Sequence, residues 1–155
     1  MNPARLTVAT AAAALVIGLT ACTSTPQASA EADADAKAFV AHPAASTIYV
    51  YRSPFNHDEF DSVLYLDGRV IGSTLPGAYF RIDTVPARHV LHGTGIDVGE
   101  IALQTRPGEI YIVSLEVLAG HSNFRLVPDR LGEQHIRACC ALLENWGPGQ
   151  RPLIK

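Results

Sequence analysis

From residue 47 onward, short runs of apolar and β-branched residues alternate with turn residues, and no other feature constrains the fold of this chain as strongly. Runs of this length are typical of strands and are too short for most helices. The runs are residues 47–52, 62–67, 69–73, 79–84, 88–92, 100–105, 110–118 and 122–127. Because such strands must bury one face, they predict a mainly β fold, an antiparallel β-sandwich of about eight short strands.

Three connections between these runs carry turn signals. Asp67-Gly68 is typical of a two-residue hairpin, because Gly accepts a positive φ. Arg106-Pro107-Gly108-Glu109 suits a type II turn with Pro and Gly at its central positions. Val85-Pro86-Ala87 marks another turn. We therefore expect short hairpins, although their spacing does not say which sheet each hairpin joins.

The end of the chain has a different pattern. Apolar residues recur there at helical spacing, at Ile136, Cys139, Cys140 and Leu143. This pattern predicts one C-terminal amphipathic helix over about residues 133–145. We expect its apolar stripe to pack on the sandwich.

The N-terminal segment specifies a cellular location. Leu19-Thr20-Ala21-Cys22 closes an apolar stretch that follows a single cation, Arg5, and resembles a bacterial lipobox. The stretch suits a signal peptide and is short for a membrane span, which needs about 20 apolar residues. The resemblance implies export, diacylglycerol on the Cys22 sulfur, cleavage before Cys22 and acylation of the new amine. A plain secretory signal and an uncleaved membrane helix are the alternatives.

These features divide the chain into three parts. Residues 1–21 are expected to be a lipoprotein signal peptide, 22–46 the lipidated cysteine with a flexible tether, and 47–155 the β-sandwich domain. The tether is polar and Ala-rich and would span about 25–30 Å as a coil, although a short helix over 30–41 is an alternative. Thr23 follows the cysteine, which in a Gram-negative host resembles lipoproteins of the outer membrane that face the periplasm.

The charge of the chain limits its partners. The full sequence has a formal net charge of −3, and the mature side chains sum to −4 because residues 1–21 contain one Arg and no acid. A basic patch is the expected footprint of a nucleic-acid-binding protein, so nucleic acid is disfavoured. Attraction to anionic lipid is disfavoured for the same reason, and the acyl chains on Cys22 are expected to hold the protein on a membrane.

Five motifs resemble a bacterial lipoprotein family known only as domain of unknown function 2846. They are Ile48-Tyr49-Val50-Tyr51-Arg52, Leu64-Tyr65-Leu66-Asp67-Gly68-Arg69, Gly77-Ala78-Tyr79-Phe80, Pro86-Ala87-Arg88-His89-Val90-Leu91 and Gly108-Glu109-Ile110-Tyr111-Ile112-Val113. The resemblance covers roughly residues 47–127 and the lipobox, and it departs from the family at Ala87, where Pro-Gly is usual. It implies a fold and a lipid anchor, and it transfers no catalytic residues.

The densest polar cluster is His57-Asp58-Glu59 with Asp61, in the connection between the first two strands. A His with carboxylates is a weak candidate for a metal site or an acid–base pair. Adjacent loop residues seldom converge on one ion, so a solvated loop is the favoured interpretation.

Two further histidines and a glycine-rich segment have structural interpretations. His89 and His92 are three residues apart on an expected strand, so they point to opposite faces and cannot chelate together. His89 shares a face with Leu91 and is expected to be half-buried. Residues 93–99 resemble a phosphate loop only superficially, because a strand rather than a helix follows them, and we expect a hairpin connection.

Cys139 and Cys140 are adjacent in the sequence. On a helix their Cα atoms would lie about 3.8 Å apart, below the usual disulfide range. A bridge between them would require a break in the helix. We therefore expect two small buried thiols, with a redox or intermolecular disulfide as the alternative.

Tyr49 and Tyr51 share one face of the first strand and form a candidate binding face, although strand aromatics are more often packed in a core. The sequence contains no recognised catalytic motif, and we expect neither cofactor nor enzymatic activity. The expected function is a membrane-anchored, non-enzymatic binding or structural lipoprotein of the cell envelope, with a protein or glycan partner. The alternatives are an accessory subunit of an envelope secretion or transport assembly, and an envelope hydrolase using the His57 loop.

Overall fold

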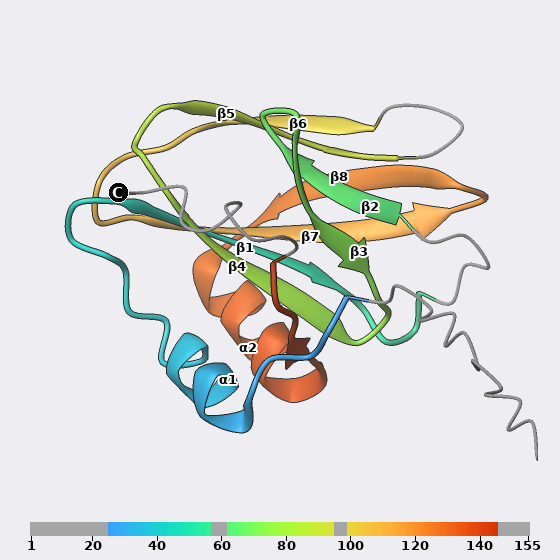
Figure 1. Cartoon of the computed structure of the whole chain (residues 1–155), viewed down its shortest axis with the longest axis horizontal. Coiled ribbons are helices and arrows are strands. Elements are labelled where there is room, and N and C mark those ends of the chain that lie inside the picture. Colours follow the sequence, from blue (N-terminus) through green and yellow to red (C-terminus); the bar gives the residue numbers. More distant parts are fainter. Residues whose placement is uncertain (1–24, 57–61, 95–98, 146–155) are drawn as a thin grey trace, which may run out of the picture.

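Two sheets packed face to face make up most of the molecule (Figure 1). The computed structural model describes residues 25–56, 62–94 and 99–145. The elements are α1 (Ala30–Ala36), β1 (Ser46–Arg52), β2 (Ser62–Leu66), β3 (Arg69–Thr74), β4 (Ala78–Thr84), β5 (Arg88–Gly93), β6 (Glu100–Gln104), β7 (Ile110–Leu118), β8 (His121–Val127), α2 (Asp129–Cys139) and β9 (Ala141–Leu142). The expected mainly β sandwich with a C-terminal helix is confirmed.

The two sheets have the strand orders β8-β7-β1-β4-β9 and β3-β2-β5-β6. The central strand β1 pairs antiparallel with β4 and parallel with β7, so that Val50 lies between Phe80 and Val113. These three side chains belong to the core between the sheets, together with Leu64 and Leu91 of the second sheet. The core therefore fills the space between the sheets, as expected for alternating strands.

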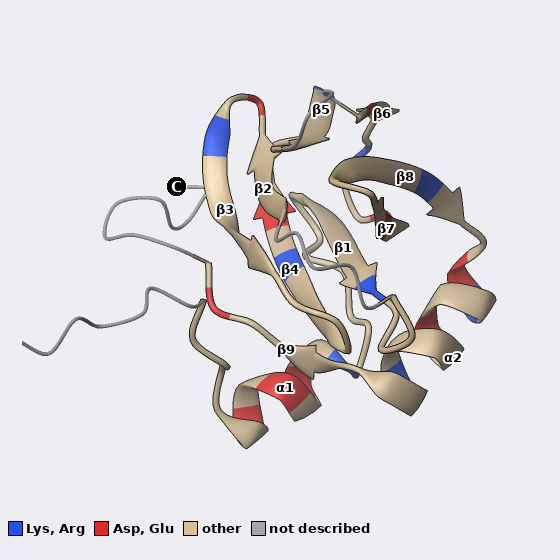
Figure 2. Ribbon diagram, turned by 90° about the vertical axis from the view of Figure 1, so that its right-hand side faces the viewer, with Lys and Arg blue, Asp and Glu red and all other residues tan. Residues whose placement is uncertain are grey.

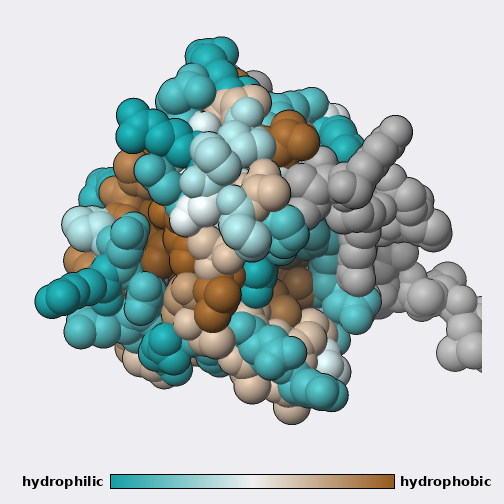
Figure 3. All heavy atoms as spheres, turned by 90° about the vertical axis from the view of Figure 1, so that its left-hand side faces the viewer, coloured by the Kyte–Doolittle hydropathy of each residue, from teal (hydrophilic) through white to brown (hydrophobic). Residues whose placement is uncertain are grey.

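Hairpins join only some neighbouring strands. β2–β3, β5–β6 and β7–β8 pair directly, and Asp67 and Gly68 have φ angles of 49° and 75°, as a type I′ turn requires. The turns at residues 85–87 and 105–109 instead carry the chain from one sheet to the other. The expectation of hairpins at these two turns is wrong, because a turn signal fixes a reversal of direction but not the sheet that receives the next strand. Figure 3 shows the end of the molecule where these turns lie, with a mostly hydrophilic surface around an exposed apolar area.

Residues 25–45, which we call the strap, pack on the outer face of the five-stranded sheet. Ser29 caps α1 by accepting a hydrogen bond from the Ala32 amide at 3.1 Å. The Tyr49 hydroxyl donates to the Ala36 carbonyl at 2.7 Å, and the Phe39 and Tyr49 rings lie 4.9 Å apart. The expected flexible tether is therefore wrong for the strap, because tyrosines of the sheet supply contacts that its own apolar content could not.

Helix α2 covers the same face but ends earlier than expected. It stops at Cys139, Cys140 is extended with φ −122° and ψ 143°, and the two cysteines form a disulfide. Residues Ala141 and Leu142 then pair with β4 as the edge strand β9. The expected bounds of the helix, 133–145, and the expected pair of free thiols are both wrong: α2 ends at Cys139 because the backbone beyond it pairs with the edge of β4, and the two thiols are joined.

Close approach of α2 to the sheet depends on one glycine. A Cβ atom placed at Gly132 would lie 2.5 Å from Cγ2 of Ile112 on β7.

None of the described helices is long and apolar enough to cross a membrane.

Candidate functional site

A groove with a volume of about 530 Å³ lies on the outer face of the five-stranded sheet. It is bounded by α2, by the turn at residues 53–56 and by β7 and β8, and we call it the α2 groove. Its lining residues are Tyr51, Ser53, Pro54, Phe55, Asn56, Ser114, Leu115, Glu116, Asn123, Arg125, His135, Ala138 and Cys139. The volume falls within the range of small-molecule sites in proteins, about 300–1,000 Å³.

The floor of the α2 groove is polar. In the β7–β8 pair, Ser114 lies opposite Arg125 and Glu116 lies opposite Asn123. Because alternate residues of a strand share a face, these four side chains point to the same outer surface. Glu116, Asn123 and Arg125 are exposed. The floor thus offers a hydroxyl, a carboxylate, an amide and a guanidinium within one small area.

A buried arginine and an asparagine hold the turn at residues 53–56. Arg52 is 1% exposed, and its Nε donates to Oδ1 of Asn56 at 2.8 Å. The Asn56 amide also donates to the Val117 carbonyl at 2.7 Å and accepts from the Val117 amide at 2.8 Å. Asn56 therefore acts as a local strand partner of β7 and fixes the turn. The position of this turn places Phe55, which is 90% exposed, beside the groove.

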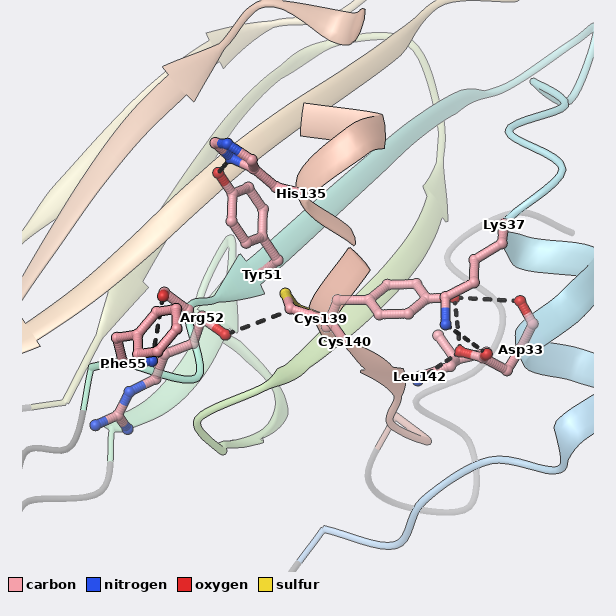
Figure 4. Close-up of a disulfide and its surroundings, with 11 residues drawn as sticks. Asp33, Lys37, Tyr51, Arg52, Phe55, His135, Cys139, Cys140 and Leu142 are labelled. Atoms are coloured by element: carbon pink, nitrogen blue, oxygen red, sulfur yellow. Dashed lines mark hydrogen bonds and ion pairs between the residues drawn. A yellow bond between two sulfur atoms is a disulfide. The ribbon is translucent and has the colours of Figure 1, made fainter. Parts of the chain in front are cut away.

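Tyr51 of β1 and His135 of α2 meet in the groove (Figure 4), where the Tyr51 hydroxyl lies 2.8 Å from Nδ1 of His135. Burial raises the pKa of Tyr51, so its hydroxyl stays protonated in the hydrogen bond with Nδ1 of His135. The pair therefore fixes the orientation of the histidine ring.

The disulfide forms part of the groove wall. Cys139 lines the groove, whereas Cys140 is 4% exposed and its Sγ lies 3.9 Å from the Arg52 carbonyl oxygen. With Pro54, Phe55 and Ala138, the bridge gives the groove an apolar side opposite its polar floor. The α2 groove is thus amphipathic in cross-section.

The candidate binding face at Tyr49 and Tyr51 is not an exposed patch. Tyr49 is fully buried under α1 and Tyr51 is 6% exposed. Burial raises the pKa of Tyr49 to about 12, so its hydroxyl remains a donor to the strap. The two residues share a face, but helices that could not be placed from the sequence cover it.

The other candidates fall into two groups. Cys22, the residues His57, Asp58, Glu59 and Asp61, and residues 95–98 lie outside the described part of the chain. His89 is buried, with Nδ1 2.6 Å from Asp67 Oδ2 and Nε2 2.7 Å from the Val85 carbonyl, so it is a structural clamp between turns. His92 stacks on Tyr65 across the strand pair, with ring centroids 4.7 Å apart.

Within residues 25–56, 62–94 and 99–145, no three His, Cys, Asp or Glu side chains are grouped so that they could hold a metal ion. A second cavity of about 430 Å³ lies near the N-terminus of α2 and is lined by Phe39, Ala41, Gly108, Glu109, Ile110 and Asp129. Its polar side chains are two carboxylates, Glu109 and Asp129, whereas the larger α2 groove combines a hydroxyl, a carboxylate, an amide and a guanidinium with an apolar wall. We therefore take the α2 groove as the candidate site.

The sequence interpretation missed the groove floor, although a signal was present. Ser114 and Glu116 alternate with buried Val113, Leu115 and Val117 in the run 110–118. Period-two alternation places both polar residues on the outer face. What the pattern could not supply was the pairing with β8 and the helix beside it.

Comparison with known proteins gives no relative. No family model matches the chain, and neither a curated protein nor a solved structure is significantly similar to it. The resemblance to the lipoprotein family therefore stays a prediction from the motifs.

Proposed function

We propose that this protein is a lipid-anchored, non-enzymatic lipoprotein of the bacterial envelope that binds an envelope glycan in the α2 groove. The lipobox ending at Cys22 supports the anchor. The observation that carries the binding role is the groove itself, an open cleft of about 530 Å³ with polar side chains on its floor and apolar side chains on one wall.

The chemistry of a sugar ring fits this cross-section. A pyranose has an apolar face of C–H groups and an edge of hydroxyl groups. Phe55 and Pro54 offer an apolar surface on which the C–H face can pack. Glu116, Asn123 and Arg125 can accept from and donate to the hydroxyl groups. The same floor would be a poor partner for an unbroken hydrocarbon chain, because its polar groups would lose their hydrogen bonds to water.

The test is co-sedimentation with insoluble peptidoglycan, a polymer of amino sugars. The full-length lipidated protein in detergent micelles is compared with the triple variant Glu116→Ala, Asn123→Ala, Arg125→Ala. Three lost hydrogen bonds at about 1 kcal/mol each correspond to roughly 100-fold weaker binding. We expect the variant to remain in the supernatant.

A matched control changes the same kinds of residue on the other sheet. Arg88→Ala, Glu100→Ala, Gln104→Ala alters three exposed residues of β5 and β6 and should sediment like the parent. Equal binding by all three proteins would exclude the groove as the glycan site. No sedimentation of the parent would exclude peptidoglycan as the ligand.

A further inference from the structure

The strap fixes where the anchored end of the chain leaves the fold. Thr25 is 3% exposed and packs against Gly72 of β3, where a Cβ atom would lie 3.1 Å from its Oγ1. The Pro26 carbonyl accepts from the Glu144 amide at 2.8 Å, and Gln27 forms a bridge with Leu143. Residue 25 is therefore fixed to the fold, and it is only three residues after Cys22 in the sequence.

Three residues set a short limit on the distance between lipid and fold. A fully extended chain spans at most about 3.6 Å per residue, so Thr25 lies within about 11 Å of Cys22. A flexible tether over the whole of residues 22–46 would instead separate the two by about 25–30 Å. The folded strap thus removes most of the distance that its length could provide.

The position of Thr25, where the chain from Cys22 reaches the fold, lies on one side of the sandwich. β3 is an edge of the four-stranded sheet and β9 is an edge of the five-stranded sheet, and the strap residues 26–28 pair beyond β9. We call this side, formed by β3, β9 and residues 25–28, the anchor side. In Figure 2, β3 lies at the left, while β8 and α2 lie at the right.

We propose that the lipid on Cys22 seats the anchor side against the bilayer surface and leaves the α2 groove facing away from it. This inference rests on the proposed lipidation of Cys22. The groove floor lies on β7 and β8, which are three and four strand spacings, or about 14 and 19 Å, from β9. The apolar wall at Pro54 and Cys139 forms the end of the groove nearest β9. The partner of the anchor side is a lipid surface, and the groove is presented to the envelope beyond it.

The charge of the anchor side indicates which lipid surface suits it. Arg69 of β3 is an exposed cation, whereas Glu31 and Asp35 of α1, which packs against β9, are exposed carboxylates (Figure 2). Anionic headgroups attract the first and repel the other two, so charge gives no net attraction to an anionic surface. The contact is therefore enforced by the short chain and not by charge attraction, and zwitterionic lipid is the appropriate test surface.

The experiment places one tryptophan on each of the two sandwich edges. Trp146 is the only tryptophan of the chain, so Trp146→Phe provides a background without tryptophan emission. Ser73→Trp puts a probe on edge strand β3, and Ala102→Trp puts a matched probe on β6, the opposite edge of the same sheet. Each lipidated full-length protein is reconstituted into phosphatidylcholine vesicles that contain lipid with a nitroxide-labelled headgroup.

We expect the nitroxide to quench the emission of Trp at position 73 strongly and that at position 102 little or not at all. Insertion of twenty Gly and Ser residues between Ser24 and Thr25 adds a flexible span of about 25 Å. This insertion should reduce the quenching at position 73 to the level at position 102. Gln27→Trp, on the exposed part of the strap, serves as a second probe in case Ser73→Trp perturbs β3.

Vesicle flotation separates the two proposals. If the parent protein floats with the vesicles and the Cys22→Ser variant does not, the proposed anchor is present. In that case, quenching at position 73 that is equal to or weaker than the quenching at position 102 overturns the orientation alone. Protein that fails to float overturns the anchor and the orientation together. Circular dichroism of each variant verifies that the sandwich is intact.

Discussion

Asp33 is the residue that fastens the strap to the sheet. Its Oδ1 accepts hydrogen bonds from the Tyr79 hydroxyl at 3.0 Å and the Leu142 amide at 2.8 Å, and its Oδ2 pairs with the Lys37 ammonium at 2.7 Å (Figure 4). Burial acts to raise the pKa of Asp33, but the hydrogen bonds from Lys37, Leu142 and Tyr79 outweigh it and hold the pKa below its usual value of 3.8. One carboxylate thus joins α1, β4 and β9.

The substitution Asp33→Asn is expected to lower the free energy of unfolding at pH 7 by about 1–2 kcal/mol, because two acceptor bonds lose their charge assistance. A carboxyl group with a depressed folded-state pKa stabilises the fold above its unfolded pKa, and this contribution is lost as the pH falls through the folded pKa. The difference between parent and variant should therefore shrink in acid. Urea unfolding at pH 7 and pH 3 measures it, with the exposed Asp35→Asn as the control for charge. A difference that grows in acid would contradict this role.

At the scale of elements, the junction between α2 and β9 shows what local pattern could and could not predict. The helical spacing of Ile136, Cys139, Cys140 and Leu143 predicts one continuous helix, and the structure confirms the helix only as far as Cys139. Beyond Cys139 the backbone instead satisfies the edge of β4: the Ala141 amide donates to the Gly77 carbonyl at 3.0 Å, and the Leu143 amide to that of Tyr79 at 2.8 Å. A free sheet edge is a tertiary feature, so periodicity could not reveal it.

Reduction of the Cys139–Cys140 bridge is expected to leave the helix content unchanged. The backbone hydrogen bonds of β9 and the burial of Leu143 (5% exposed) do not involve the bridge, and helix propensity offers only a few tenths of a kcal/mol per residue in exchange. A bridge between neighbouring residues also closes a minimal loop. Its contribution to the free energy of unfolding should therefore be smaller than the contribution of about 3 kcal/mol expected for a bridge that closes a 15-residue loop. Circular dichroism and urea unfolding of the protein with and without dithiothreitol test this. A gain in helical signal on reduction would mean that the bridge selects β9 over a longer helix.

Predictions from the sequence succeeded where a residue's neighbours in the chain decide its conformation. The β2–β3 hairpin at Asp67-Gly68 and the alternating burial of β5 around His89 are examples. They failed where contacts with distant segments decide the conformation. The strap is an example, because its alanines bury little apolar area by themselves and the strap is held by contacts with Tyr49 and Tyr79. The same limit hid the α2 groove, which needs three strands, a helix and a turn from four parts of the chain.

At the scale of the whole molecule, the strap is packed as part of the same folding unit as the sandwich. Deletion of residues 25–45 removes the acceptor of the Tyr49 hydroxyl and uncovers the aromatic cluster beneath α1. We expect the free energy of unfolding to fall by about 3 kcal/mol or more, from lost hydrogen bonds and exposed apolar area. Urea unfolding of the deleted chain measures the loss.

Limited proteolysis of the intact protein gives an independent check of this packing. Protease-resistant protein should start near residue 25, because the strap backbone is packed and hydrogen-bonded. Rapid cleavage between residues 30 and 45, with a stable product starting near 46, would show that the strap is not part of the folding unit.

The parallel pairing of β1 with β7 has a consequence for the time course of folding. In this pairing Thr47 lies opposite Ile110 and Arg52 lies opposite Leu115. The central strand β1 is therefore synthesised early, but its hydrogen bonds to β7 can form only after most of the chain has been made. Contacts of such large sequence separation slow folding, and β1 exposes Ile48 and Val50 for as long as β7 is missing. If the chain is exported as proposed, β1 lacks its β7 partner until about residue 118 has crossed the membrane, and a chaperone that holds the unfolded chain there would protect it from aggregation.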